Sequence, residues 1–114
     1  MQEWAIMKKY QLRFWFEHGG YCCWGMNDEA KKEYGYAIKN DTLPISNLTI
    51  KNLHDLENEY ATYLDWNDPL KPSSWTIEQK VSFVERATVV CERMLNELGK
   101  EFDVVNEVNL SVEV

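Results

Sequence analysis

The stretch Lys9-Tyr10-Gln11-Leu12-Arg13-Phe14-Trp15-Phe16-Glu17 sets a row of large apolar side chains against a second row that is mostly polar. Successive side chains of a β-strand point to opposite faces, so the alternation predicts a half-buried strand over residues 7–17 with a buried side formed by Tyr10, Leu12, Phe14 and Phe16. The next residues, His18, Gly19 and Gly20, tolerate the positive φ angles of a tight turn. Because residues 21–26 form an aromatic, β-compatible run, we expect an antiparallel hairpin.

Two more strands are expected further along the chain. Residues 27–35 fit a short helix or turn that Gly35 closes, and residues 36–38 fit a short third strand. Residues 102–108, with the sequence Phe-Asp-Val-Val-Asn-Glu-Val, fit a final strand.

Helical periodicity is strongest between these strands. Apolar residues recur at three- and four-residue steps over 48–64, which predicts a helix with an apolar side made of Leu53, Leu56, Tyr60, Tyr63 and Leu64. Asp55, Glu57 and Glu59 are then expected to point away from that side. Thr76 and Gln79 have the spacing of a capping box, so a second helix should begin near Ile77 and end before Gly99. Its expected apolar side consists of Ile77, Val81, Val84, Ala87, Cys91, Met94, Leu95 and Leu98.

Two helices with one apolar side each need a surface to cover, and a sheet with one apolar face provides it. We therefore predict a two-layer α+β fold, in which an antiparallel sheet of three to four strands is covered by two main helices. The length of 114 residues suits one domain, and no internal repeat or flexible linker divides residues 1–114.

The charge of the chain is strongly acidic. Nineteen Asp and Glu residues stand against twelve Lys and Arg, which gives a formal net charge of -7. This balance opposes binding to nucleic acid or to an anionic membrane and favours a basic protein partner. Residues 40–68 contain six acidic residues and only one base, Lys51, so an acidic surface is expected there, although an ordinary solvated helix surface would have a similar composition.

Signals for catalysis, metal binding or a cofactor are weak. The three cysteines, Cys22, Cys23 and Cys91, have no CxxC spacing, and strand alternation would point the two adjacent thiols to opposite faces. We expect reduced thiols, no metal and no cofactor. The sequence contains no phosphate-binding loop, HExxH or GxSxG motif, and it shows neither a signal-peptide pattern nor a membrane-spanning run. A non-catalytic, soluble protein of the cytoplasm is the expectation.

Two tryptophans flank a proline-containing loop after the first long helix. Trp66 lies between Asp65 and Asp68, and Trp75 ends the loop. Exposed tryptophans next to acidic groups are typical anchors of protein interfaces. The alternative is that both side chains fold inward and fix the loop over the helix pair.

Several phrases of the sequence resemble a known class of small bacterial proteins. They are residues 24–28 (Trp-Gly-Met-Asn-Asp), 43–46 (Leu-Pro-Ile-Ser), 63–69 with 74–76, and 96–99 (Asn-Glu-Leu-Gly). Together they are similar to immunity proteins of polymorphic and contact-dependent toxin systems, over about residues 12–108. The resemblance implies a small cytosolic protein that binds the catalytic domain of a toxin, which in nuclease toxins is basic.

We therefore expect an immunity protein that neutralises a basic toxin or nuclease domain through an acidic, aromatic-anchored surface. Charge and helix position alone select its expected contact residues: Asp55, Glu59, Asp65, Trp66 and Asp68. One alternative is a small enzyme or ligand-binding domain with a pocket between sheet and helices, lined by Tyr10, Phe14, Trp24 and Tyr60. A second alternative is a homodimer that pairs through an open sheet edge at residues 104–114.

Overall fold

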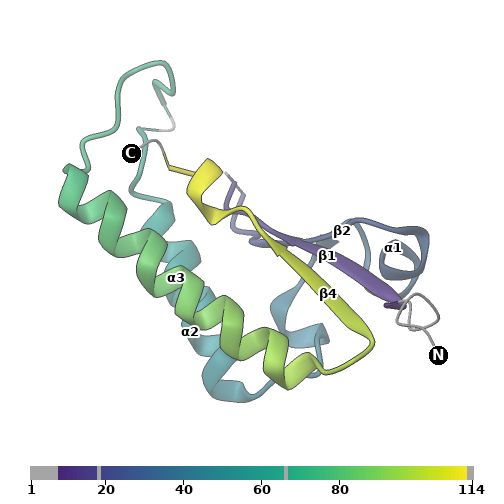
Figure 1. Cartoon of the computed structure of the whole chain (residues 1–114). Helices are drawn as coiled ribbons and strands as arrows, with labels where there is room; N and C mark the ends of the chain where they lie inside the picture. The colour runs from purple at the N-terminus through teal and green to yellow at the C-terminus, as the bar shows by residue number, and fades with distance from the viewer. Residues whose placement is uncertain (1–7, 18, 66, 113–114) are drawn as a thin grey trace.

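The computed structural model describes residues 8–17, 19–65 and 67–112, and it shows two layers. A four-stranded sheet with the order β3-β2-β1-β4 forms one layer, and the two long helices α2 and α3 lie together against it (Figure 1). The short helix α1 lies at the end of the sheet where β1 begins. The predicted α+β class with two main helices and four strands is therefore confirmed.

The strand β1 (Tyr10–Phe14) has the predicted orientation. Leu12 and Phe14 are fully buried, Tyr10 is nearly so, and Phe16 just beyond the strand is buried as well. β1 pairs antiparallel with β2 (Cys23–Gly25), with Leu12 opposite Gly25. The predicted hairpin is confirmed; of its turn residues, His18 lies outside the described residues.

The segment after the hairpin also follows its local signals. The side chain of Asn27 accepts a hydrogen bond from the backbone N–H of Ala30 and so caps α1 (Asp28–Tyr34). Gly35 ends the helix with a φ of 94°, a value that side chains disfavour. β3 (Ala37–Ile38) then pairs antiparallel with β2, which confirms the predicted third strand.

The final strand runs in the direction opposite to our prediction. β4 (Phe102–Asn106) pairs parallel with β1, with Tyr10 opposite Phe102, so the sheet is mixed and not entirely antiparallel. The cause is α3 (Ile77–Leu98), whose 22 residues span about 33 Å at 1.5 Å per residue. It carries the chain back along the sheet, so that β4 starts beside the start of β1 (Figure 1). The strand ends at Asn106, and a 3₁₀ turn at Val108–Leu110 follows where a longer strand was expected.

The first long helix, α2 (Asn47–Tyr60), is shorter at its end than predicted. After Tyr60 the chain turns tightly, because Tyr63 donates its backbone N–H to the carbonyl oxygen of Tyr60 at 2.9 Å. The Tyr63 ring stacks on that of Tyr60 with centroids 5.4 Å apart and stays buried. Leu53, Leu56 and Tyr60 are buried as predicted.

The second long helix, α3, has the predicted capping box at Thr76 and Gln79 and the predicted end at Gly99. Its buried side differs from the prediction at the first turns: Ile77 is 65% exposed and Val81 is exposed too. These turns extend past the edge of the sheet, so they have no apolar surface to cover (Figure 1). The residues that are buried are Phe83, Ala87, Val90, Cys91, Met94 and Leu98.

Candidate functional site

Two of the five predicted contact residues lie on the exposed side of α2. Asp55 is exposed and forms an ion pair with Lys51 one turn earlier, with 2.8 Å between the Lys51 Nζ and the Asp55 carboxylate. Glu59 reaches across to α3, where the two terminal nitrogens of the Arg86 guanidinium, Nη1 and Nη2, donate to its two carboxylate oxygens at 2.7 and 2.6 Å. Both acids are therefore paired within the chain, Asp55 in a solvent-exposed pair along one helix and Glu59 in a bidentate pair between the two helices.

The other predicted contact residues belong to the loop after α2. Asp65 and Asp68 are exposed, and Asp65 accepts hydrogen bonds from the backbone N–H groups of Asn67 (3.0 Å) and Asp68 (2.9 Å). Trp66 lies outside the described residues. Trp75 folds inward, as the alternative interpretation expected for it, and donates its indole N–H to the hydroxyl of Thr62 at 3.0 Å.

The structure places Asp55 and Glu59 together at a groove between α2 and α3, which we call the α2–α3 groove. On one side of the Glu59–Arg86 pair is a hollow of about 390 Å³, the valine hollow, lined by Asn52, Asp55, Leu56, Glu59, Arg86, Val89 and Val90. On the other side is a hollow of about 400 Å³, the tryptophan hollow, lined by Glu59, Thr62, Trp75, Glu78, Gln79, Ser82 and Arg86. Asp65 and Asp68 line neither hollow.

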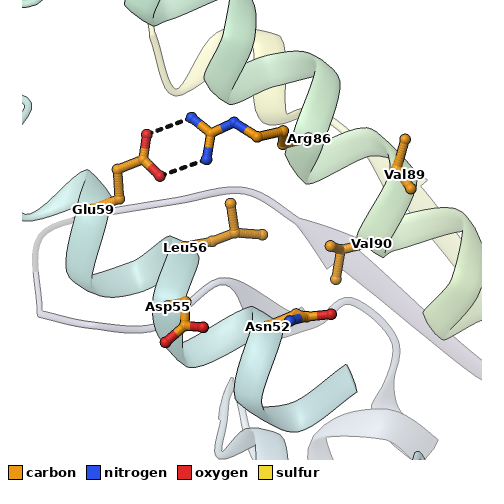
Figure 2. A pocket seen from close by; sticks show the side chains of 7 residues that line it. All are labelled: Asn52, Asp55, Leu56, Glu59, Arg86, Val89 and Val90. Carbon is orange, nitrogen blue, oxygen red and sulfur yellow. Dashed lines mark hydrogen bonds and ion pairs between the residues drawn. The ribbon is translucent and has the colours of Figure 1, made fainter. Parts of the chain in front are cut away.

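Figure 2 shows how the valine hollow is built. Leu56 from α2 and Val90 from α3 point into the space between the helices and form an apolar floor. The Glu59–Arg86 pair closes one end, and Arg86 is fixed further because its Nε donates to the hydroxyl of Ser82 at 3.0 Å. The two parallel hydrogen bonds of the bidentate pair fix the relative orientation of the two side chains at this end of the hollow.

A second polar network fixes the other end of the helix pair. The Glu97 carboxylate on α3 accepts hydrogen bonds from the backbone N–H of Ser46 at 2.8 Å and from the hydroxyl of Thr49 at 2.9 Å. The backbone hydrogen bond from Ser46 lowers the pKa of Glu97. Arg93 donates to the side chains of Thr49 and Asn52. The two networks hold α2 and α3 in register at both ends of the valine hollow.

Glu57 does not share the exposed orientation predicted for it. Its carboxylate is half-buried and accepts a hydrogen bond from the side-chain amide of the buried Asn40 at 3.1 Å. Burial raises the pKa of Glu57, against the opposing effect of that hydrogen bond. Glu57 also lines an open hollow of about 260 Å³ beside Lys39 and His54. The acidic surface is thus smaller than the sequence suggests, because Glu57 points inward and Glu59 is paired with Arg86.

The aromatic pocket of the ligand-binding alternative does not form. Tyr10 packs on Phe102 with ring centroids 4.8 Å apart, and Phe14 packs on Phe16 at 5.2 Å. Trp24 faces the other side of the sheet, since it stands opposite the outward-pointing Arg13. These rings fill the core or cover the sheet, and they do not line one shared cavity.

The three cysteines are free and buried. The Cys22 and Cys23 sulfurs lie 4.0 Å apart, so the prediction that they point to opposite faces is wrong; Cys22 precedes β2 and is not bound by strand alternation. Burial raises the pKa of Cys91 to about 12, which keeps its thiol protonated at neutral pH. Within the described ranges no group of three or more metal-ligating side chains is placed to hold an ion.

A further surface, which sequence reasoning did not single out, lies on the sheet face that points away from α2 and α3. We call it the outer sheet face, and its residues are Arg13, Trp15, Trp24, Tyr36 and Val105. The Arg13 guanidinium lies 3.9 Å from the centroid of the Trp15 ring and pairs with Glu107. The Trp15 indole N–H has no hydrogen-bond partner among the described residues. The sequence did contain a signal for this surface. Arg13 and Trp15 alternate with the buried residues of the first strand, so both were expected on its opposite face.

The described site is thus a groove between two helices with acidic side chains along it. Comparison with known families shows that the family model described as Serratia CdiI immunity protein-like matches residues 11–107. The chain belongs to this family, so the predicted resemblance is confirmed and its partner is a toxin that it neutralises. No curated protein matches the chain. None of the helices in the described part of the chain is both long and apolar enough to cross a membrane.

Proposed function

We propose that this immunity protein acts in the cytoplasm by binding a basic nuclease domain of its toxin, without catalysing a reaction itself. The observation that carries the proposal is the acidic excess of residues 40–68, of which Asp55, Asp65 and Asp68 expose their carboxylates on one helix and the loop that follows it. A nuclease must present a basic surface to grip phosphates, so an acidic surface both speeds encounter and competes with the nucleic acid.

The proposed contact residues are Asp55, Glu59, Asp65, Trp66 and Asp68, and they contribute in different ways. The three exposed aspartates supply long-range attraction, which salt screens. Glu59 positions Arg86 and supports the α2–α3 groove through their bidentate pair. Trp66 stands between two of the aspartates in the sequence, a placement suited to an aromatic anchor. A reducing compartment is consistent with three free, buried thiols.

The test uses the catalytic domain of the toxin from the protein's own contact-dependent system. Its affinity and its nuclease activity are measured with the wild-type chain and with a variant carrying Asp55→Asn, Asp65→Asn and Asp68→Asn. The variant should bind about tenfold more weakly and with a flatter salt dependence, since each exposed ion pair contributes up to about 1 kcal/mol. A matched control with Glu29→Gln, Glu101→Gln and Asp103→Asn removes the same charge from other exposed positions. If both variants lose the same affinity for the toxin domain, the net charge of the chain, and not the position of these acids, determines binding.

One observation supports the alternative that the chain forms a homodimer. β4 forms an edge of the sheet, and Val105 on it is half-exposed, so a second copy has a strand on which to pair. A sedimentation coefficient that rises with protein concentration and falls back in a Val105→Lys variant would favour the dimer. A sedimentation coefficient that does not change with protein concentration would favour a monomeric inhibitor.

A further inference from the structure

The α2–α3 groove combines an apolar floor with an acidic rim, and this combination constrains what fits it. In the valine hollow the floor is Leu56 and Val90, and Val89 stands 62% exposed at its side. In the tryptophan hollow the buried ring of Trp75 supplies the apolar surface. An occupant must therefore offer apolar atoms to both hollows.

The charge of the groove lining is negative. Among the lining residues, the carboxylates of Asp55, Glu59 and Glu78 stand against the guanidinium of Arg86, and Lys51, which pairs with Asp55 from outside the lining, reduces the surplus to one negative charge. Arg86 is already engaged by Glu59, which leaves the carboxylates of Asp55 in the valine hollow and Glu78 in the tryptophan hollow to meet an incoming cation. The ion pair of Asp55 with Lys51 is exposed to solvent and contributes little, so an incoming cation can replace Lys51 there.

We propose that this groove receives a segment of the toxin in which a lysine or arginine stands beside an apolar side chain. The aliphatic stem of a basic residue packs on Leu56, Val89 and Val90 while its charged head reaches Asp55, as long basic side chains do on apolar surfaces. The neighbouring apolar side chain occupies the tryptophan hollow. The inference rests on the proposed function, because it names the part of the basic toxin that the acidic surface recognises.

The rival surface offers less to a basic segment. On the outer sheet face the charge nearest the aromatic rings is Arg13 itself, which repels a second cation and already occupies the face of Trp15. The carboxylate of Glu107 is paired with Arg13. Beside the aromatic rings a basic side chain meets the matched Arg13–Glu107 pair, and the exposed Asp103 on the same face stands opposite Gln11. At the groove it meets Glu78 and Asp55, whose exposed partner Lys51 it can replace.

The groove is tested first without the toxin, with n-butylguanidinium as the probe. Titration should shift the backbone amide signals of Asn52, Leu56 and Val89 in nuclear magnetic resonance spectra. Guanidinium without the tail and butyrate without the cation should shift them much less. A variant with Asp55→Asn and Glu78→Gln should bind the probe about two- to fivefold more weakly, whereas Asp103→Asn on β4 should not. Equal shifts with butyrate, or shifts centred on Trp24 and Tyr36, would overturn the proposal.

The second test uses the toxin domain and two matched substitutions of exposed valines. Val89→Lys places a cation and extra bulk in the valine hollow, and Val105→Lys makes the same change on β4. We expect Val89→Lys to weaken toxin binding at least tenfold and Val105→Lys to leave it unchanged. If the wild-type chain binds the toxin and neither substitution changes the affinity, the groove is not the binding site, whereas the proposed function stands. If wild-type chain binds no basic toxin domain, the proposed function fails, and the butylguanidinium titration still decides the groove by itself.

Discussion

The α2–α3 groove and the outer sheet face both expose apolar and charged side chains, but they use them differently. On the sheet, Arg13 lies over Trp15 and pairs with Glu107, and the Trp24 ring packs 5.3 Å from that of Tyr36. In the groove, the carboxylate of Glu78 is exposed and the hollows on both sides of the Glu59–Arg86 pair are open. An interface needs groups that are not already satisfied within the chain, so burial and aromatic content alone do not identify it.

Loss of the support beneath the groove is expected to have the largest effect. Phe83 is fully buried, with its ring 5.0 Å from that of Phe16 and 5.2 Å from that of Trp75. Phe83→Ala should lower the free energy of unfolding by about 3–5 kcal/mol, because the cavity left behind adds to the lost burial. The measurement is urea unfolding. Tyr36→Ala on the outer sheet face, where the ring is 61% exposed, should change stability by less than about 1 kcal/mol. Similar losses in the two variants would contradict the assignment of the core.

The polar network at the start of α2 should have an intermediate effect. Ser46→Ala removes the helix cap that accepts the backbone N–H of Thr49 and should cost about 1 kcal/mol. Because the pKa of Glu97 is lowered in the folded chain, its contribution is present above the unfolded pKa and lost as the pH falls through the folded pKa. The acid-induced loss of stability between these values should shrink in Glu97→Gln. If the dependence of stability on pH is the same in Glu97→Gln and wild type, the hydrogen bonds of Glu97 do not contribute to stability.

The effect of pH on the contribution of Glu57 to stability should be opposite to that of Glu97. Burial raises its pKa in the folded chain, so its favourable contribution is complete below the unfolded pKa and disappears as the pH rises through the folded pKa. At neutral pH the ionised carboxylate costs stability, and Glu57→Gln should be slightly more stable than wild type because its side-chain oxygen can still accept from Asn40. The gain should vanish below about pH 4, near the ordinary pKa of a glutamate. A less stable variant at pH 7 would show that the charge itself is required.

The smallest expected effect is on toxin binding by the outer sheet face. Tyr36→Ala should leave the affinity for the toxin domain within about twofold, which corresponds to less than 0.5 kcal/mol. Isothermal titration with wild type and variant measures the difference. A loss of tenfold or more would move the interface from the helices to the sheet.

Local signals in the sequence predicted most of the secondary structure. The alternation of β1, the capping box at Thr76, and the glycines that end α1 and α3 each depend on residues a few positions apart, and all were confirmed. The parallel pairing of β4 was missed because it depends on the length and path of α3. Ile77 was assigned to the core because helical periodicity cannot show where the sheet ends.

The candidate site was predictable only in part, for the same reason. The sequence selected Asp55 and Glu59 as acids on the exposed side of a helix. It could not show that Glu59 pairs with Arg86, 27 residues later, or that Glu57 turns toward Asn40, 17 residues earlier. The groove itself exists only where two helices meet, so no single stretch of sequence contains it.

The most direct test of the central claim is the footprint of the toxin domain on the folded chain, measured by backbone amide hydrogen exchange with and without the toxin. If the groove is the contact surface, slowed exchange should be concentrated at residues 52–59 of α2 and 86–90 of α3, while residues 23–25 and 37–38 of the sheet keep their free rates. Protection centred on β2 and β3, with unchanged exchange in both helices, would contradict it.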